Sequence, residues 1–147
     1  MDQSVARDYF EALLDYAFDL TYVRNLGENH VEFLYVQCAR VAESYDSVRT
    51  MLLADIEMCL VRQYTVENGT KSRPAGLVPS EFIWFLAHRT KWPEFEEIAE
   101  RISALPEDVW RSNPLRRSSV ELRAALSVNW EDSDFYSSLS GQQPWPN

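Results

Sequence analysis

The sequence predicts an all-α, single-domain bundle of about six or seven helices, with an irregular stacking of helical hairpins as the alternative arrangement. Apolar residues recur at spacings of three and four along most of the chain, which is the period of an amphipathic helix. Helix-start signals occur at Pro79-Ser80, Trp92-Pro93 and Asn113-Pro114. A length of 147 residues with 46% hydrophobic residues suffices for one domain with its own core.

The first helix is expected to span residues 3–25, with Gly27 ending it in a left-handed conformation. An apolar stripe along this helix has spacings of three and four, so it is expected to face the core. The stripe consists of Val5, Tyr9, Leu13, Tyr16, Leu20 and Val23.

Two further helices are expected to complete the first half. Residues 29–44 fit a helix, although apolar residues near their start also alternate as they would in a strand. Asp46 is typical of an N-cap for a third helix over residues 47–64. Cys38 and Cys59 lie within these apolar patterns and lack the close spacing of a metal or redox site, so both are predicted to be reduced core thiols.

A loop rich in glycine and proline, residues 67–79, is expected to join two helical halves of one domain spanning residues 1–139. Residues 82–87 are apolar on every side, which predicts a central helix that is buried on most sides. The segments that follow are a helix beginning at Pro93, a helix over residues 113–127, a short helix over residues 131–139 and a loose tail over residues 140–147.

The net charge of −9 is the most informative global property of the chain. An acidic surface repels nucleic acid and anionic membranes, and it attracts basic partners. There is no apolar run long enough to span a membrane, and the N-terminus lacks the pattern of a secretion signal. We therefore expect a cytoplasmic protein that contacts neither nucleic acid nor membrane directly.

Four acidic residues form a stripe on the first helix, roughly opposite its predicted core face. They are Asp8, Glu11, Asp15 and Asp19. Like charges at these spacings destabilise a helix by about 0.2–0.5 kcal/mol per pair. In the sequence only Arg7 and Arg24, near the helix ends, are placed to relieve them. The stripe is either a solvated face or a binding face for a basic partner, with Phe18 at its edge adding an apolar contact. Carboxylates spread along a rod do not converge on one ion, so no metal site is expected.

A second candidate surface combines acidic and large aromatic side chains near the end of the chain, a composition common at interfaces. Its candidate binding residues are Trp130, Glu131, Asp132, Asp134, Phe135 and Tyr136. The alternative is a final helix capped by Ser133, with the aromatic residues folded onto the core. The Asp-x-Asp fragment lacks the glycine and distal glutamate of a calcium loop.

An arginine followed after five residues by a histidine, Arg24 and His30, supports one enzymatic interpretation. Together with Asn25, this spacing resembles the short Arg/His motif of the HEPN ribonucleases, which are also helical. The resemblance covers seven residues, and it implies that Arg24 and His30 would act on the RNA backbone across a dimer.

The leading hypothesis is a non-enzymatic acidic binding protein of the inhibitor or immunity type. Its partner would be a basic protein such as a toxin or a nuclease, bound through the first helix and residues 130–136. No nucleophile elbow, Walker loop, Rossmann glycines or zinc spacing occurs in the sequence, so we expect no catalytic residue and no cofactor. A helical scaffold or adaptor subunit and the HEPN-like ribonuclease are the alternatives.

Overall fold

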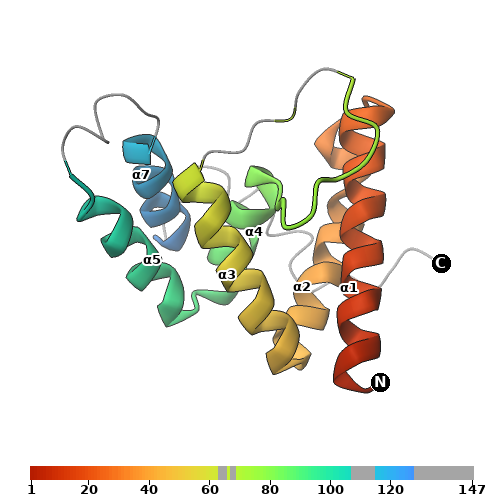
Figure 1. The fold of residues 1–147 in the computed structure, drawn as a ribbon, viewed down its shortest axis with the longest axis horizontal. Helices are drawn as coiled ribbons and strands as arrows, with labels where there is room; N and C mark the ends of the chain where they lie inside the picture. The colour runs from red at the N-terminus through yellow and green to blue at the C-terminus, as the bar shows by residue number, and fades with distance from the viewer. Residues whose placement is uncertain (63–65, 67–68, 107–114, 128–147) are drawn as a thin grey trace.

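The computed structural model describes residues 1–62, 66, 69–106 and 115–127, and over this part of the chain its regular structure is entirely helical (Figure 1). This confirms the predicted fold class. The described α-helices are α1 (Gln3–Phe18), α2 (Glu32–Ser44), α3 (Asp46–Arg62), α4 (Ser80–Thr90), α5 (Pro93–Ser103) and α7 (Leu115–Leu126). A π-helical segment, Asp19–Val23, continues α1, and a 3-10 turn, Glu28–His30, precedes α2.

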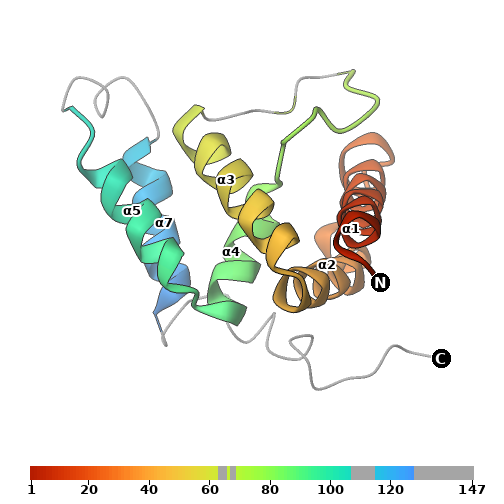
Figure 2. The same cartoon turned by 60° about the horizontal axis from the view of Figure 1, so that its bottom comes forward.

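The helices are arranged with α1 at one end of the molecule and the pair α5 and α7 at the other (Figures 1 and 2). α1 packs against α2 and α3, and α5 packs against α7. α4 contacts both α2 and α7, so it connects the two ends through one continuous core. None of the helices described is long and apolar enough to cross a lipid bilayer.

The centre of the core is a cluster of aromatic rings contributed by α1, α2 and α4. The ring centroid of Phe82 lies 5.2 Å from that of Tyr35 and 6.4 Å from those of Phe10 and Phe85. All four of these side chains are almost completely buried. Such tilted aromatic pairs add about 0.5–1.5 kcal/mol each beyond the burial of their surface. The prediction that α4 is central and buried is confirmed.

The predicted core face of α1 is wrong. The side of α1 that faces α2 and α3 consists of Ala6, Phe10, Leu14, Ala17 and Phe18, whereas most of the predicted stripe is exposed. The reason is that apolar residues cover more than half of the circumference of α1. Two stripes then have helical spacing, and periodicity does not show which of them the neighbouring helices cover. Small residues such as Ala6 and Ala17 let those helices approach closely.

The chain leaves the first helix differently from the prediction. Asn25, with φ of 55°, adopts the left-handed conformation that was expected at Gly27. Asparagine tolerates the left-handed conformation better than most residues, which explains why the helix can end at Asn25 and does not need Gly27. The strand alternative for residues 29–44 is also excluded, because α2 begins at Glu32. α3 starts at Asp46 itself, within the usual uncertainty of a helix boundary.

Polar contacts join α3 to α5 alongside the apolar core. The guanidinium of Arg49 donates two hydrogen bonds from Nη2 to the Glu94 carboxylate, at 2.7 and 2.8 Å, and its carbon lies 4.4 Å from the ring centroid of Trp92. Burial opposes ionisation of Glu94, but the hydrogen bond and charge of Arg49 prevail and lower the pKa of that carboxyl. Arg101 on α5 also pairs with Glu57 on α3, and its Nε donates to both carboxylate oxygens at 3.0 Å. These partly exposed pairs refine how the two helices align.

The aromatic cluster predicts a large effect of truncating its central ring. We expect Phe82→Ala to lower the free energy of unfolding by about 3–5 kcal/mol, because it leaves a cavity where α1, α2 and α4 meet. Urea denaturation followed by circular dichroism measures this change. The exposed Val120 provides the control, since Val120→Ala should change stability by less than about 0.5 kcal/mol. Equal effects of the two substitutions would contradict the assigned core.

Candidate interaction surface

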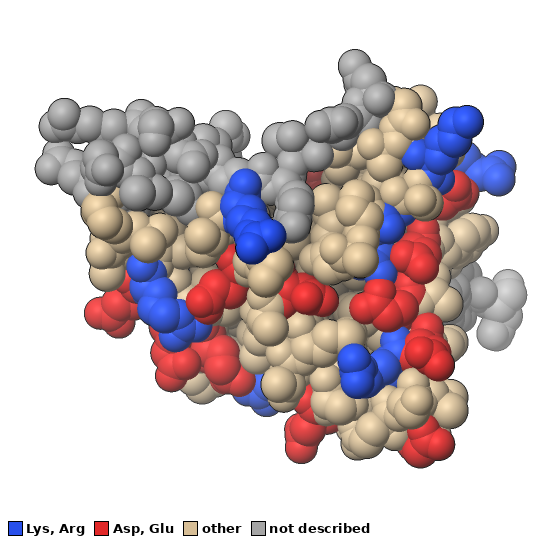
Figure 3. All heavy atoms as spheres, in the orientation of Figure 1, with Lys and Arg blue, Asp and Glu red and all other residues tan. Residues whose placement is uncertain are grey.

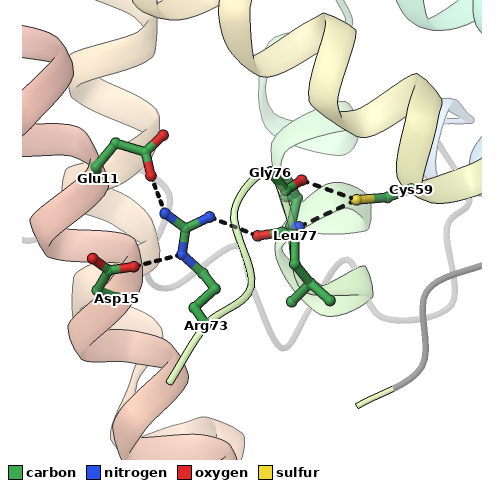
Figure 4. A network of polar contacts seen from close by, with 7 residues as sticks. Glu11, Asp15, Cys59, Arg73, Gly76 and Leu77 are labelled. Carbon is green, nitrogen blue, oxygen red and sulfur yellow. Dashed lines mark hydrogen bonds and ion pairs between the residues drawn. The ribbon is translucent and has the colours of Figure 1, made fainter. Parts of the chain in front are cut away.

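The acidic stripe of α1 is divided by a contact that the sequence pattern did not indicate. Arg73, from the loop between α3 and α4, binds both Glu11 and Asp15 (Figure 4). Asp19 pairs with Arg24, with 2.9 Å between Nε and Oδ2, and Asp8 is exposed. The expectation that only arginines near the ends of the helix relieve the stripe is therefore wrong. Side-chain pairs within a helix involve residues three or four positions apart. The spacing of residues in α1 therefore gives no information about an arginine that lies about 60 residues further along the chain.

All three nitrogens of the Arg73 guanidinium donate hydrogen bonds. Nε donates to Asp15 Oδ1 at 2.7 Å, Nη2 donates to Glu11, and Nη1 donates to the carbonyl of Leu77 at 2.8 Å. The Arg73 side chain is only 4% exposed, so its charge would be costly to bury without these partners. The rigid fork of arginine suits this arrangement, because it aims several donors in one plane. Arg73 therefore fastens the loop to α1.

The same loop is attached to α3 through Cys59. The thiol of Cys59 donates to the carbonyl of Gly76 at 3.2 Å, and the amide of Val78 donates to its sulfur at 3.3 Å (Figure 4). Gly76 has φ of 78°, a conformation that glycine adopts without strain. Cys59 and Cys38 are both buried and free, as predicted. Burial raises the pKa of each thiol, which keeps both protonated.

Asp55 lies beneath this loop and completes a charged cluster between α1 and α3. A Cβ atom added to Gly76 would lie 3.6 Å from Asp55 Oδ1, so the loop passes close over the carboxyl. Burial raises the pKa of Asp55, the nearby charge of Glu11 raises it further, and Arg73 opposes both. The cluster therefore holds more carboxylates than cations. We call Glu11, Asp15, Arg73 and Asp55 the loop clasp.

Phe18 was predicted to reach a partner, and the structure contradicts this. Its side chain is 1% exposed and packs on the ring of Tyr22, with 4.8 Å between the centroids. Phe18 lies close to Leu14 around the helix, on the side turned toward the core. The hydroxyl of Tyr22 in turn donates to Glu81 on α4, at 3.2 Å. Phe18 thus belongs to the core, where it anchors the end of α1.

The outward side of α1 carries apolar side chains that the sequence pattern assigned to the core. Val5 is 48% exposed, Tyr9 43% and Tyr16 53%, and the exposed Ala12 lies between the two tyrosines. Asp8 and Asp15 follow one edge of this row, at about 100° per residue. We call Val5, Tyr9, Ala12 and Tyr16 the outer row. The signal available in the sequence was an apolar coverage of α1 wider than one buried face needs.

The structure, in the part of the chain that it describes, does not place the remaining predicted site residues beside the outer row. Trp130, Glu131, Asp132, Asp134, Phe135 and Tyr136 lie outside the described residues. Arg24 and His30 are both exposed, and the Arg24 guanidinium is bonded to Asp19. The ribonuclease interpretation stays a prediction. His88, by contrast, contacts the carbonyl of Ala125 through Nδ1 at 2.8 Å and joins α4 to α7.

Comparison with known proteins gives no relative from which a function could be transferred. No family model matches the chain, and searches of curated proteins and of solved structures found no match. Within the residues that the structure describes, no group of three or more His, Cys, Asp or Glu side chains could hold a metal ion. The outer row and its acidic edge are therefore the surface on which a functional argument rests.

Removing the central cation of the loop clasp should destabilise the fold. We expect Arg73→Met to lower the free energy of unfolding by about 1–3 kcal/mol, because charged hydrogen bonds and the contact with Leu77 are lost together. Urea unfolding measures the change without screening charges. Lys71→Met removes the same charge from an exposed position of the same loop and should cost less than about 0.5 kcal/mol. Similar losses in the two variants would refute the clasp.

Asp55 predicts a pH dependence of stability. Because its pKa is raised above the ordinary value of 3.8, the folded state binds more protons than the unfolded state between the two values. Stability from this group is therefore present at low pH and is lost as pH rises through the folded pKa. Asp55→Asn should gain stability over the unmodified protein as pH rises above about 4. Denaturation across a pH series measures this, with the exposed Asp8→Asn as the matched control. A pH-independent difference would contradict the assignment.

Proposed function

We propose that this protein is a non-enzymatic binding protein that recognises a basic protein partner through the outward side of α1. The observation that carries the proposal is the exposure of Val5, Tyr9 and Tyr16 in one row beside Asp8 and Asp15. The class that best fits is an inhibitor or immunity-type protein that neutralises a basic toxin or nuclease.

The exposed aromatic residues support a binding role. Tyr9 and Tyr16 leave about half of their surface in water, although α1 already has a complete core face of its own. Contiguous exposed apolar groups of this kind mark interaction sites on otherwise polar proteins. Tyrosine is also enriched among the residues that dominate binding energies, because it offers a large rigid surface and one polar group.

The charge supports a basic partner. The net charge is −9, and acidic side chains gather over α1 and along α5 on the face shown in Figure 3. Such a field accelerates the encounter with a cationic protein and repels nucleic acid. The apolar row then supplies the short-range contact that charge alone does not provide.

The cysteines do not favour a catalytic role. The thiolate is the reactive form of cysteine, and burial raises the pKa of both Cys38 and Cys59, so neither is activated as a nucleophile. Both sulfur atoms lie in the core, and Cys59 already serves the loop as donor and acceptor. The state of the two cysteines is therefore compatible with the proposed binding role.

The proposal is tested by affinity capture from the native host with three baits. The baits are the unmodified protein, Asp8→Lys with Tyr16→Ser on α1, and Glu97→Lys with Val120→Ser on α5 and α7 as the matched control. We expect one stoichiometric basic protein on the unmodified and control baits, weakened more than about tenfold on the α1 bait and released as salt rises. Capture of no basic protein, or equal loss on the α1 and control baits, would refute the proposal.

A further inference from the structure

We propose that the partner docks an amphipathic helix, basic along one flank, lengthwise on the outer row of α1. This inference rests on the proposed function and specifies the shape of the partner at the same surface.

The spacing of the outer row is that of a helix–helix seam. Val5, Tyr9, Ala12 and Tyr16 are separated by four, three and four residues. This alternation repeats every seven residues and keeps one seam facing a second helix, as at the a and d positions of a coiled coil. From the first to the last position the row extends about 16 Å at 1.5 Å per residue, so it matches roughly three turns of a partner helix.

The shape of the row also suits a helix. Ala12 is exposed and lies between Tyr9 and Tyr16 along the row, so a small side chain alternates with two large ones. A small residue at such a position gives a side chain of a facing helix room to pack between its larger neighbours. Figures 1 and 2 show α1 at the end of the molecule, so no other described helix lies beyond it.

The acidic flank defines the charge pattern of the docked helix. Asp8 and Asp15 are seven residues apart, and each directly precedes a tyrosine of the row. The other flank consists of the buried Ala6 and the partly buried Leu13, so the charge lies on one side only. A partner helix would place lysine or arginine at a spacing of about seven residues opposite these carboxylates.

The loop clasp holds part of this flank in place. Arg73 bonds Asp15 through one carboxylate oxygen, while 58% of the Asp15 side chain stays exposed. A carboxylate that is already ordered loses less side-chain entropy when it meets a cation. The buried guanidinium thus positions Asp15 for the partner without occupying its outward side.

A second copy of this chain fits the surface less well. Each copy carries a net charge of −9, which opposes the approach of a second copy. In an antiparallel seam the acidic flanks would face each other, and in a parallel seam each would face the apolar flank of the other copy, so neither arrangement gives Asp8 and Asp15 a cation. A basic amphipathic helix of a different protein can pack apolar side chains on the outer row and pair its cations with Asp8 and Asp15.

The test uses isotope-labelled full-length protein and two synthetic peptides of identical composition. In the first peptide leucine follows a heptad pattern, lysine is confined to one flank of the leucine stripe, and uncharged polar residues fill the other positions. In the second the same residues are shuffled so that leucine is spread around the helix. We expect the first peptide to bind at least about tenfold tighter at moderate salt and to shift resonances of the outer row.

A substitution that enlarges the small residue of the row separates the effect of shape from that of charge. Ala12→Trp leaves every charge in place, and it should weaken the amphipathic peptide by at least about tenfold. Ala54→Trp, at an exposed alanine on α3, should have no effect and controls for the added ring. Unfolding curves of both variants establish that each remains folded.

The outcomes distinguish this inference from the proposed function. Equal binding of both peptides, with shifts spread over the acidic surface, overturns helical docking and leaves a basic partner in place. Absence of peptide binding, while the host partner still binds through α1, overturns it as well. A dimer that Ala12→Trp disrupts, or contacts between the outer row and residues 128–147 in the free protein, would show that the row is already occupied. Absence of both peptide and host partner would end both proposals.

Discussion

α4 carries apolar residues on nearly every side and contacts helices from both ends of the molecule. Its apolar residues point in several directions at once, so they can leave water only if helices cover α4 on more than one side. α2 and α7 contact it directly, and the aromatic ring of Phe82 reaches Phe10 on α1 and Tyr35 on α2. One helix thereby joins segments from both halves of the chain into a single core. The polar pairs between α3 and α5, such as Arg49 with Glu94, refine an arrangement that this burial already requires.

The placement of α1 follows from that core and determines what the surface presents. One side of α1 packs in the core through Phe10 and Leu14, and Phe18 extends this buried side to the C-terminal end of the helix. The helix is apolar over more than half of its circumference, and the neighbouring helices cover only one side of it. Tyr9 and Tyr16 therefore remain exposed to water. The loop clasp then uses Glu11 and Asp15 to hold the connection between the two halves against α1. In the proposed function, structural and binding roles are divided around one helix, and Asp15 takes part in both.

The fold class could be predicted from the sequence because helical periodicity and proline positions are local properties. The buried positions of α5, including Phe95 and Ile98, match its apolar spacing, since this helix has one apolar stripe to bury. The same reasoning failed on α1, where two stripes were available and only the neighbouring helices decided between them. It failed again on Phe18, which lies at the border between the core side and the acidic side.

Composition and helical periodicity were enough to predict that this chain folds into helices around an apolar core, carries a net charge of −9 and keeps two free thiols in its interior. The packing of the helices was needed to establish which side of α1 is buried, that Arg73 binds two carboxylates of the acidic stripe and that Tyr9 and Tyr16 face outward. Helix propensity, capping and periodicity act over a few residues. The burial of a helix face depends instead on packing against other helices, and Arg73 lies about 60 residues from its partners in α1.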